Sequence, residues 1–283
     1  MGKIWLERAG SLKSLAFIAG VFIFFIASQQ NAVAAPTAEK AEKIEFWDDS
    51  EEHSRFSIKH GPWDAILKKY VIVDHPSGIN RFDYDAVTTA DKESLDNYLK
   101  YMQSMDPRQS PKERQKAYWI NLFNATLVHR VLNSSSIDSI QDLGGRFWKR
   151  KKIKIAMQKI SLNDIEHGIL RPIFKDPRVH FSLVEGAEGA ANILPQAFTM
   201  ENVDELLEQN TRDFIAHQRG VSQGNDGGLV LSTIFKWYEE DFGGDLNGVK
   251  QFVSPYVAEE LSQLLAQATE VTYEYDWSLN KPE

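Results

Sequence analysis

Gln115 to Leu132 reads QKAYWINLFNATLVHRVL, and this stretch decides the fold. Apolar residues occur on nearly every side of the helix that it would form, so no polar face is left for solvent. A helix of this kind lies inside a protein, and the rest of the chain is too polar to suggest a membrane span here. We therefore expect a buried central helix. The preceding Ser110-Pro111-Lys112-Glu113 reads as a capping box with proline at the first helical position.

Further helices and a few short strands are predicted around this central helix. Helical patterns run over residues 91–105, 203–214 and 257–268. Strand-like patterns are limited to residues 151–155, 229–231 and 271–275. Because helices outnumber strands and the two do not alternate regularly, the expected class is α+β. We expect a helix-rich single domain around a buried central helix, with a small, mostly antiparallel sheet.

The first residues have the three zones of a secretory signal peptide. A basic start leads into an apolar run from Leu15 to Ala27, and the small-residue box Ala32-Val33-Ala34 follows. The apolar run is about 13 residues long, whereas a membrane span needs roughly 20. We expect cleavage near Ala34 and a periplasmic or secreted product without a transmembrane span. An uncleaved membrane anchor is the alternative.

The chain is expected to have three parts: a signal peptide (1–34), a polar arm (35–60) and a domain (61–283). The arm is rich in charged residues and should be loosely held, although Phe46 and Trp47 could dock it onto the body. No internal repeat and no proline- or serine-rich linker divides the remaining residues, which favours one domain over two.

Charge and cysteine content exclude several classes of protein. The formal net charge is −8, and removal of the signal peptide, which holds three basic residues and one acidic residue, makes it −10. An acidic body argues against a nucleic-acid partner. The absence of cysteine excludes lipid attachment through cysteine, disulfides, thiolate nucleophiles and cysteine metal ligands.

Four blocks of sequence carry a family resemblance. They are AYWINLFNA at 117–125, SLNDIEHGILR at 161–171, DPRVHFSLV at 176–184 and YDWSLN at 275–280. In content and order they resemble blocks of the domain-of-unknown-function 547 family. Together with the stretch from Leu231 to Phe242, they extend the resemblance over roughly residues 60–280.

The chain departs from that family at one place. The resemblance implies two cysteines five residues apart after the third block, and Glu185 and Ala190 stand at those positions. If relatives use the first cysteine as a nucleophile or metal ligand, this chain cannot do so. If the pair is a structural disulfide, its absence removes about 2–4 kcal/mol of stability and leaves function unchanged.

Glu166, His180 and Glu185 are the candidate catalytic residues. Glu166 borders the apolar stripe of a short helix that Ser161 caps, with Asp164 at its third position. A buried carboxylate there is either ion-paired or raised in pKa for proton transfer. If residues 180–185 form a strand, His180 and Glu185 point to opposite faces and meet only if the chain turns at Gly186.

The candidate binding residues are Asn121, Asn124, His167, Arg171 and Arg178. The two asparagines lie one turn apart on a helix with no other polar face, so they must pin backbone or hold a ligand. The two arginines are possible partners for Glu166. A lone histidine in such a place is more often a hydrogen-bonded structural residue than a catalytic one, so a structural role for His180 is the alternative.

No spacing in the sequence matches a metal-ligand or phosphate-binding signature, and we expect no metal and no cofactor. The basic run from Lys149 to Lys154 is conspicuous in an acidic chain. A solvated strand edge is the simpler interpretation, and contact with an anion or a phospholipid headgroup is the alternative.

Two classes of function remain open. The first is a binding or accessory module that keeps an enzyme-like scaffold for a small molecule, a peptide or an envelope protein. The second is an extracytoplasmic hydrolase or transferase that uses a Glu/His/Asn polar site without a thiol. A carboxylate is a far poorer nucleophile toward acyl groups than a thiolate, which favours the binding module.

Overall fold

The computed structural model describes residues 40–283. The predicted signal peptide and its cleavage site therefore lie outside the described residues. Within residues 40–283, no helix combines the length and apolar character needed to cross a membrane.

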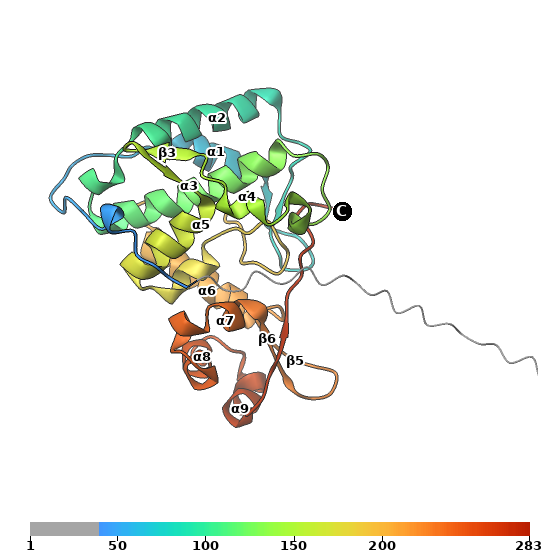
Figure 1. The fold of residues 1–283 in the computed structure, drawn as a ribbon. Coiled ribbons are helices and arrows are strands. Elements are labelled where there is room, and N and C mark those ends of the chain that lie inside the picture. Colours follow the sequence, from blue (N-terminus) through green and yellow to red (C-terminus); the bar gives the residue numbers. More distant parts are fainter. Residues whose placement is uncertain (1–39) are drawn as a thin grey trace, which may run out of the picture. The chain divides into compact units, whose positions relative to one another are not determined.

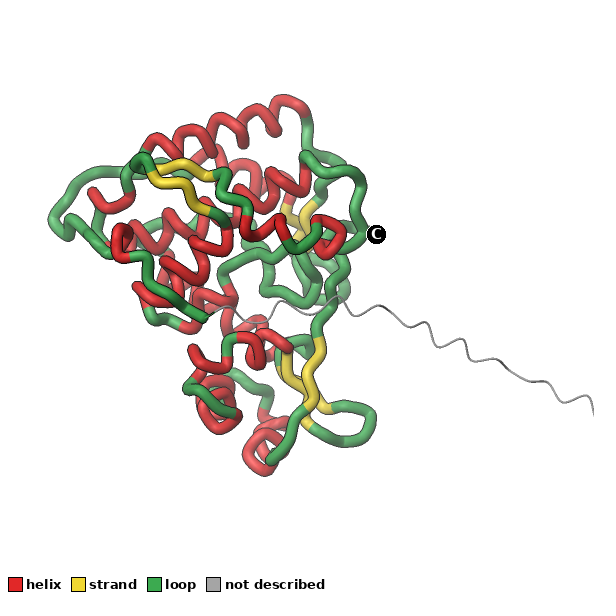
Figure 2. Tube along the Cα trace, viewed as in Figure 1, coloured by secondary structure: helices red, strands yellow, loops and turns green. Residues whose placement is uncertain are grey.

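Helices dominate the described part of the chain, and the strands are short (Figures 1 and 2). The α-helices are α1 (Gly61–Tyr70), α2 (Thr89–Ser104), α3 (Lys112–Leu132), α4 (Arg146–Lys149), α5 (Leu162–Ile165), α6 (Val203–Ala216), α7 (Thr233–Trp237), α8 (Leu246–Val253) and α9 (Glu259–Gln267). The strands are β1 (Val71–Ile72), β2 (Arg81–Phe82), β3 (Ile153–Ile155), β4 (Gln158–Ile160), β5 (Val221–Gln223), β6 (Leu229–Ser232) and β7 (Thr272–Glu274).

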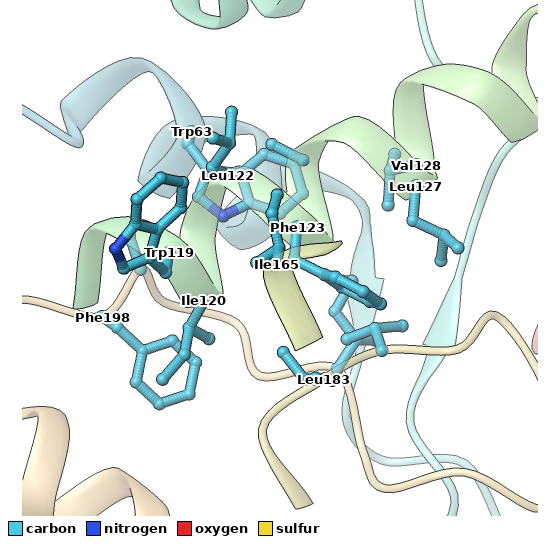
Figure 3. Packing of buried hydrophobic residues seen from close by; sticks show 14 of the residues in the cluster. Trp63, Trp119, Ile120, Leu122, Phe123, Leu127, Val128, Ile165, Leu183 and Phe198 are labelled. Carbon is cyan, nitrogen blue, oxygen red and sulfur yellow. The ribbon is translucent and has the colours of Figure 1, made fainter. Parts of the chain in front are cut away.

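The central helix is buried as predicted. Trp119, Phe123 and Leu127 of α3 are fully enclosed, and Figure 3 shows Trp119 and Phe123 projecting from α3 into the cluster that Ile165 and Leu183 help to form. Burial of a side chain of this size contributes about 1.5–3 kcal/mol. The helix-rich α+β class is confirmed.

The predicted capping box at Ser110 is wrong. The helix begins at Lys112, and Pro111 precedes it with φ −58° and ψ 154° and without a side-chain cap bond. The carbonyl of Ser110 instead accepts hydrogen bonds from the backbone of Glu51 and from the side chain of Gln115. Because Pro111 is extended, the Ser110 side chain does not reach the first turn of the helix.

The strands form three small sheets. β1 pairs with β2, β3 pairs with β4, and β5 pairs with β6, all antiparallel. β7 joins β6 on its other side as a parallel strand. A parallel pair needs a long crossover, and here the chain passes through α7, α8 and α9 before it returns.

Two clusters of buried apolar side chains form the interior. The larger surrounds α3, and the smaller is built around Phe181 and Phe235, near β5, β6, α7 and α8. Tyr275 and Trp277, which follow β7, pack against both clusters. The candidate site residues lie where these two clusters meet.

Candidate functional site

The first part of the site is the helical segment that carries Glu166, His167 and Arg171. Ser161 and Asp164 form the predicted capping box at the start of α5, with reciprocal hydrogen bonds of 3.0 and 2.8 Å. After α5 the chain continues as a wider π-helical segment, Glu166–Phe174. Segments of this kind are rare and occur frequently at functional sites.

Pro172 and the N-terminal arm account for the shape of this segment. Pro172 has no N–H, so neither the α-helical bond to the carbonyl of Gly168 nor the π-helical bond to that of His167 can form. The arm supplies both missing donors: the N–H groups of Ile44 and Glu42 bond these carbonyls at 2.9 and 3.1 Å. Gly168 permits the approach, because a Cβ there would lie 2.5 Å from the Ile44 side chain.

His180 lies in a short 3-10 helix, Pro177–Phe181, so the strand considered as one arrangement of residues 180–185 does not form. Asp176 accepts a hydrogen bond from the N–H of Arg178, and Pro177 supplies a φ that suits a first helical turn. These two residues close the chain into a tight turn before the alternating apolar residues can extend it. The side chain of His180 is only 1% exposed.

Asp241 joins His180 to Arg171. This residue belongs to the 3-10 helix Glu239–Phe242. Its Oδ2 atom lies 2.7 Å from Nε2 of His180 and accepts a hydrogen bond of 2.5 Å from Nε of Arg171. The ring of Tyr238 stacks on the imidazole at 3.9 Å and lies under the Arg171 guanidinium. The Asp241 carboxylate therefore binds both the His180 imidazole and the Arg171 guanidinium, and the Tyr238 ring covers both groups.

The protonation of this group follows from its contacts. Burial alone would raise the pKa of Asp241, but the hydrogen bonds from His180 and Arg171 lower this pKa to about 2. Burial lowers the pKa of His180, although the hydrogen bond to Asp241 opposes the shift. The net shift favours the neutral imidazole.

The second nitrogen of His180 has no hydrogen-bond partner within residues 40–283. Nδ1 is buried without a hydrogen bond, and the nearest carboxylate oxygen, Oε1 of Glu166, lies 3.9 Å away. On the other side of Glu166, Oε2 lies 3.9 Å from Nε2 of His167. His167 Nδ1 in turn lies 3.1 Å from Nη1 of Arg171. Glu166, His167 and Arg171 thus face the same polar cluster as His180.

Glu185 reaches the cluster because the chain turns after it. Gly186 has φ +72°, which favours glycine, and a Cβ there would lie 2.9 Å from Ile140. The next residues pair with the C-terminal segment, where Ala187 bridges to Leu279. This pairing brings the hydroxyl of Tyr275 to Oε2 of Glu185, to which it donates a hydrogen bond of 2.6 Å.

The electrostatics of Glu185 favour its neutral form. Burial raises the pKa of Glu185 to about 7, and the negative charge of Glu166 adds to the shift, against the hydrogen bond from Tyr275. Glu185 is nevertheless partly exposed. Around Tyr275 lie the rings of Trp237 and Trp277, at 4.8 and 4.5 Å between centroids. The partly exposed edge of the site is thus a carboxyl with a raised pKa beside three aromatic rings.

The two asparagines pin backbone. The amide of Asn121 donates to the carbonyl of Phe198 and accepts from its N–H, at 2.7 and 3.1 Å. Asn124 bonds the carbonyl of Ser182 and the N–H of Val184 in the same way, both at 2.9 Å. Asn124 therefore fixes the segment that links His180 to Glu185 without facing the site.

Arg178 lies apart from the cluster. Its guanidinium bonds Asp176 at 2.9 Å and Asp204 of α6 at 2.7 Å, so it ties the short helix of His180 to α6. Of the residues that the sequence singled out, the structure brings together Glu166, His167, Arg171, His180 and Glu185.

A small cavity opens beside the covered part of the site. Its volume is about 230 Å³, and it is lined by Arg171, Lys175, Asp176, Pro177, Glu240 and Asp241. No group of three or more His, Asp or Glu side chains within residues 40–283 is arranged to hold a metal ion. The arrangement can exchange protons and bind charged groups through its own side chains.

The sequence did not single out Asp241, Tyr238 or Tyr275 as site residues. All three lie in stretches that resemble the family, and Asp241 is the last of three consecutive acids between Tyr238 and Phe242. Acidic residues next to aromatic residues in a family-like stretch were the signal that could have pointed to Asp241. It does not reveal the partners, because Asp241 is 61 residues from His180 and 70 from Arg171 along the chain.

Residues 107–215 match the model of a family described as "Protein of unknown function, DUF547". The match confirms the resemblance over α3 to α6, and the full sequence contains no cysteine. The matched segment includes Glu166, His180 and Glu185 and ends before Tyr238 and Asp241. No curated protein and no solved structure matches the chain.

Substitution of Glu185 by glutamine is expected to change how stability depends on pH. The pKa of Glu185 is raised in the fold, so its stabilising contribution is complete below about pH 4.5 and is lost as pH rises through about 7. Relative to the parent, Glu185→Gln should gain about 1–2 kcal/mol of unfolding free energy over that interval, less than the full shift because the side chain is partly exposed.

Urea unfolding at several pH values measures this effect. Glu274→Gln, which removes an exposed carboxyl on β7, controls for the loss of one negative charge. A pH-dependent difference no larger than that of the control would contradict the raised pKa.

Proposed function

We propose that the chain is an exported binding or accessory module of the cell envelope. In this proposal a cationic group of the partner, such as a lysine side chain of a peptide, binds at Glu185 beside Tyr275 and Trp277. The observation that supports it most directly is the partly exposed carboxyl of Glu185, whose pKa is raised to about 7, at the edge of an aromatic cluster.

A bound cation would lower the electrostatic energy of the two neighbouring carboxyls, Glu185 and Glu166. It would be attracted by Glu185 and Glu166 together and would relieve the repulsion between the two carboxyls. An aromatic face adds about 0.5–2 kcal/mol for a bound cation. Since cation binding favours ionised Glu185, affinity should rise with pH through the pKa of about 7.

A hydrolase or transferase is the second candidate. One observation favours it: a carboxyl with a pKa near 7 is suited to general acid–base catalysis. The imidazole argues against it, because His180 is 1% exposed and is held by Asp241 under Tyr238, out of reach of a substrate. Within residues 40–283, no serine or threonine hydroxyl forms a hydrogen bond with the His180 ring that could activate it.

Tryptophan fluorescence with defined peptides tests the binding proposal. A short lysine peptide should alter the emission and bind more tightly at about pH 8 than at about pH 6. Glu185→Gln should weaken this binding about tenfold, whereas Glu274→Gln should not. Equal binding of an uncharged analogue, or indifference to Glu185→Gln, would contradict the proposal. If the protein instead converts the peptide chemically, and Glu185→Gln abolishes that reaction, the result would support the enzyme.

Export is a separate part of the proposal and rests on the pattern of residues 1–34. When the full chain is expressed in a bacterial host, the mature protein should begin at Ala35 and occur in the periplasmic or secreted fraction. Intact-mass measurement of the fractionated protein checks this. A full-length mass in the membrane fraction would support the uncleaved anchor.

A further inference from the structure

A second concave surface lies away from the site described above. It is a cleft of about 550 Å³ between α2, the C-terminal end of α3, α4 and the start of β3, elements that lie together in Figure 1. Four of the residues that line it are basic, and we call it the basic cleft: Lys100, Arg130, Arg150 and Lys152. Apolar side chains, including Phe147, form part of its wall.

The positive charge of the basic cleft is not neutralised by the described part of the chain. Its single acidic residue, Asp96, is bound to His129 at 2.5 Å. None of the four basic residues forms an ion pair within residues 40–283. The C-terminal end of α3 supplies only about half a negative charge through the helix dipole. An excess of positive charge therefore remains, in a chain whose net charge is −8.

Arg130 is the fixed centre of this cleft. Its guanidinium donates hydrogen bonds to the carbonyls of Phe147 at 2.8 Å and Arg150 at 3.4 Å, and it lies over the Phe147 ring. These contacts hold the side chain in place but add no negative charge. Burial lowers the pKa of Arg130, and repulsion from the neighbouring positive charge of Arg150 contributes to the same shift. A bound anion would relieve that repulsion.

Only part of the basic run from Lys149 to Lys154 lines the basic cleft. Lys151 turns away from the cleft and lies 3.4 Å from Asp164, whereas Arg150 and Lys152 line the cleft. Converging lysine and arginine side chains suit the charge and the several acceptor oxygens of a phosphate group. A concave site with an apolar wall suits a small molecule better than it suits the extended surface of a large partner.

From this arrangement we propose that the basic cleft binds the phosphate group of a small phosphorylated molecule. This site is independent of the Glu185 edge. The same chemistry could be presented by a phospholipid headgroup, so the experiment has a soluble arm and a membrane arm.

The soluble arm is calorimetric titration of the mature chain with glycerol 3-phosphate and with pyrophosphate, at about 20 mM salt to limit screening. The double variant Arg150→Ala/Lys152→Ala should lose at least about tenfold in affinity. The matched control is Lys154→Ala/Lys159→Ala, which removes the same amount of charge from two exposed positions paired across the hairpin of β3 and β4. This control should bind like the parent. Arg130 is left intact because its backbone bonds support the fold.

The membrane arm is sedimentation with phosphatidylglycerol vesicles, compared with phosphatidylcholine vesicles. Binding to the anionic vesicles alone, lost in the cleft variant and kept in the control, would support the phosphate site with a lipid headgroup as its source. Absence of binding in both arms would overturn the proposal. Equal losses in the two double variants would also overturn it, because they would reveal only diffuse attraction to positive charge.

Discussion

Substitution of Trp47 by alanine is expected to lower the free energy of unfolding by about 3–5 kcal/mol. Trp47 lies in the polar N-terminal arm, yet its side chain is only 1% exposed and meets the ring of Trp119 edge-on at 5.0 Å. Removal of the indole would leave a cavity against the central helix, which the close-packed interior cannot readily collapse to fill.

Chemical denaturation followed by circular dichroism measures this loss. Glu45→Ala in the same short helix is the control, because its ion pair with Lys43 is exposed and contributes less than about 1 kcal/mol. A loss below about 1 kcal/mol for Trp47→Ala would show that the arm adds little to the stability of the body.

The arm has a second consequence for the site. Glu42 and Ile44 satisfy the carbonyls that Pro172 leaves without donors, in the segment that carries Glu166 and Arg171. Undocking of the arm would expose or orphan these carbonyls. We therefore infer that the arm helps to shape the polar cluster as well as to bury Trp47.

Substitution of Asp241 by alanine should destabilise the protein by about 3 kcal/mol, the lower end of the range for a broken buried ion pair. The buried guanidinium of Arg171 and the imidazole of His180 would both lose their shared acceptor. The lower end applies because the Asp241 side chain is 19% exposed. The matched control is Glu240→Ala, an exposed neighbour that lines the same small cavity.

The effect of Asp241→Ala should also depend on pH. The pKa of Asp241 is lowered in the fold, so its contribution is present above about pH 4 and fades as pH falls through about 2. Denaturation of parent and variant at neutral and acidic pH checks this, and the two should converge in acid. A neutral-pH loss as small as that of Glu240→Ala would contradict the role assigned to Asp241.

Local sequence patterns predicted the elements that depend on near neighbours. The continuous apolar run predicted a buried α3, and Ser161 with Asp164 predicted the start of α5, because burial pattern and capping chemistry are readable within a few residues. At His180 the alternation of apolar residues was compatible with a strand, but Asp176 and Pro177 close a 3-10 turn there. At Ser110 a capping pattern was present, but Pro111 is extended and the carbonyl is engaged elsewhere.

The composition of the candidate site was only partly predictable. Asn121 and Asn124 had to be satisfied inside an apolar helix, and they are, by backbone groups of distant segments. Which groups these would be could not be foreseen. Tyr238 and Asp241 approach His180 only after the chain has passed through α6, β5, β6 and α7, and Tyr275 reaches Glu185 only after β7. No spacing in the sequence predicts these contacts.

The sequence by itself determined the helix-rich α+β class, the buried central helix and the absence of any thiol chemistry, because these follow from residue type and local periodicity. Only the tertiary structure decided that His180 is covered, that Asp241 joins it to Arg171 and that Glu185 lies partly exposed beside Tyr275. The physical reason is that hydrogen bonding, burial and charge coupling act across space, between side chains whose separation along the chain carries no information about their contact.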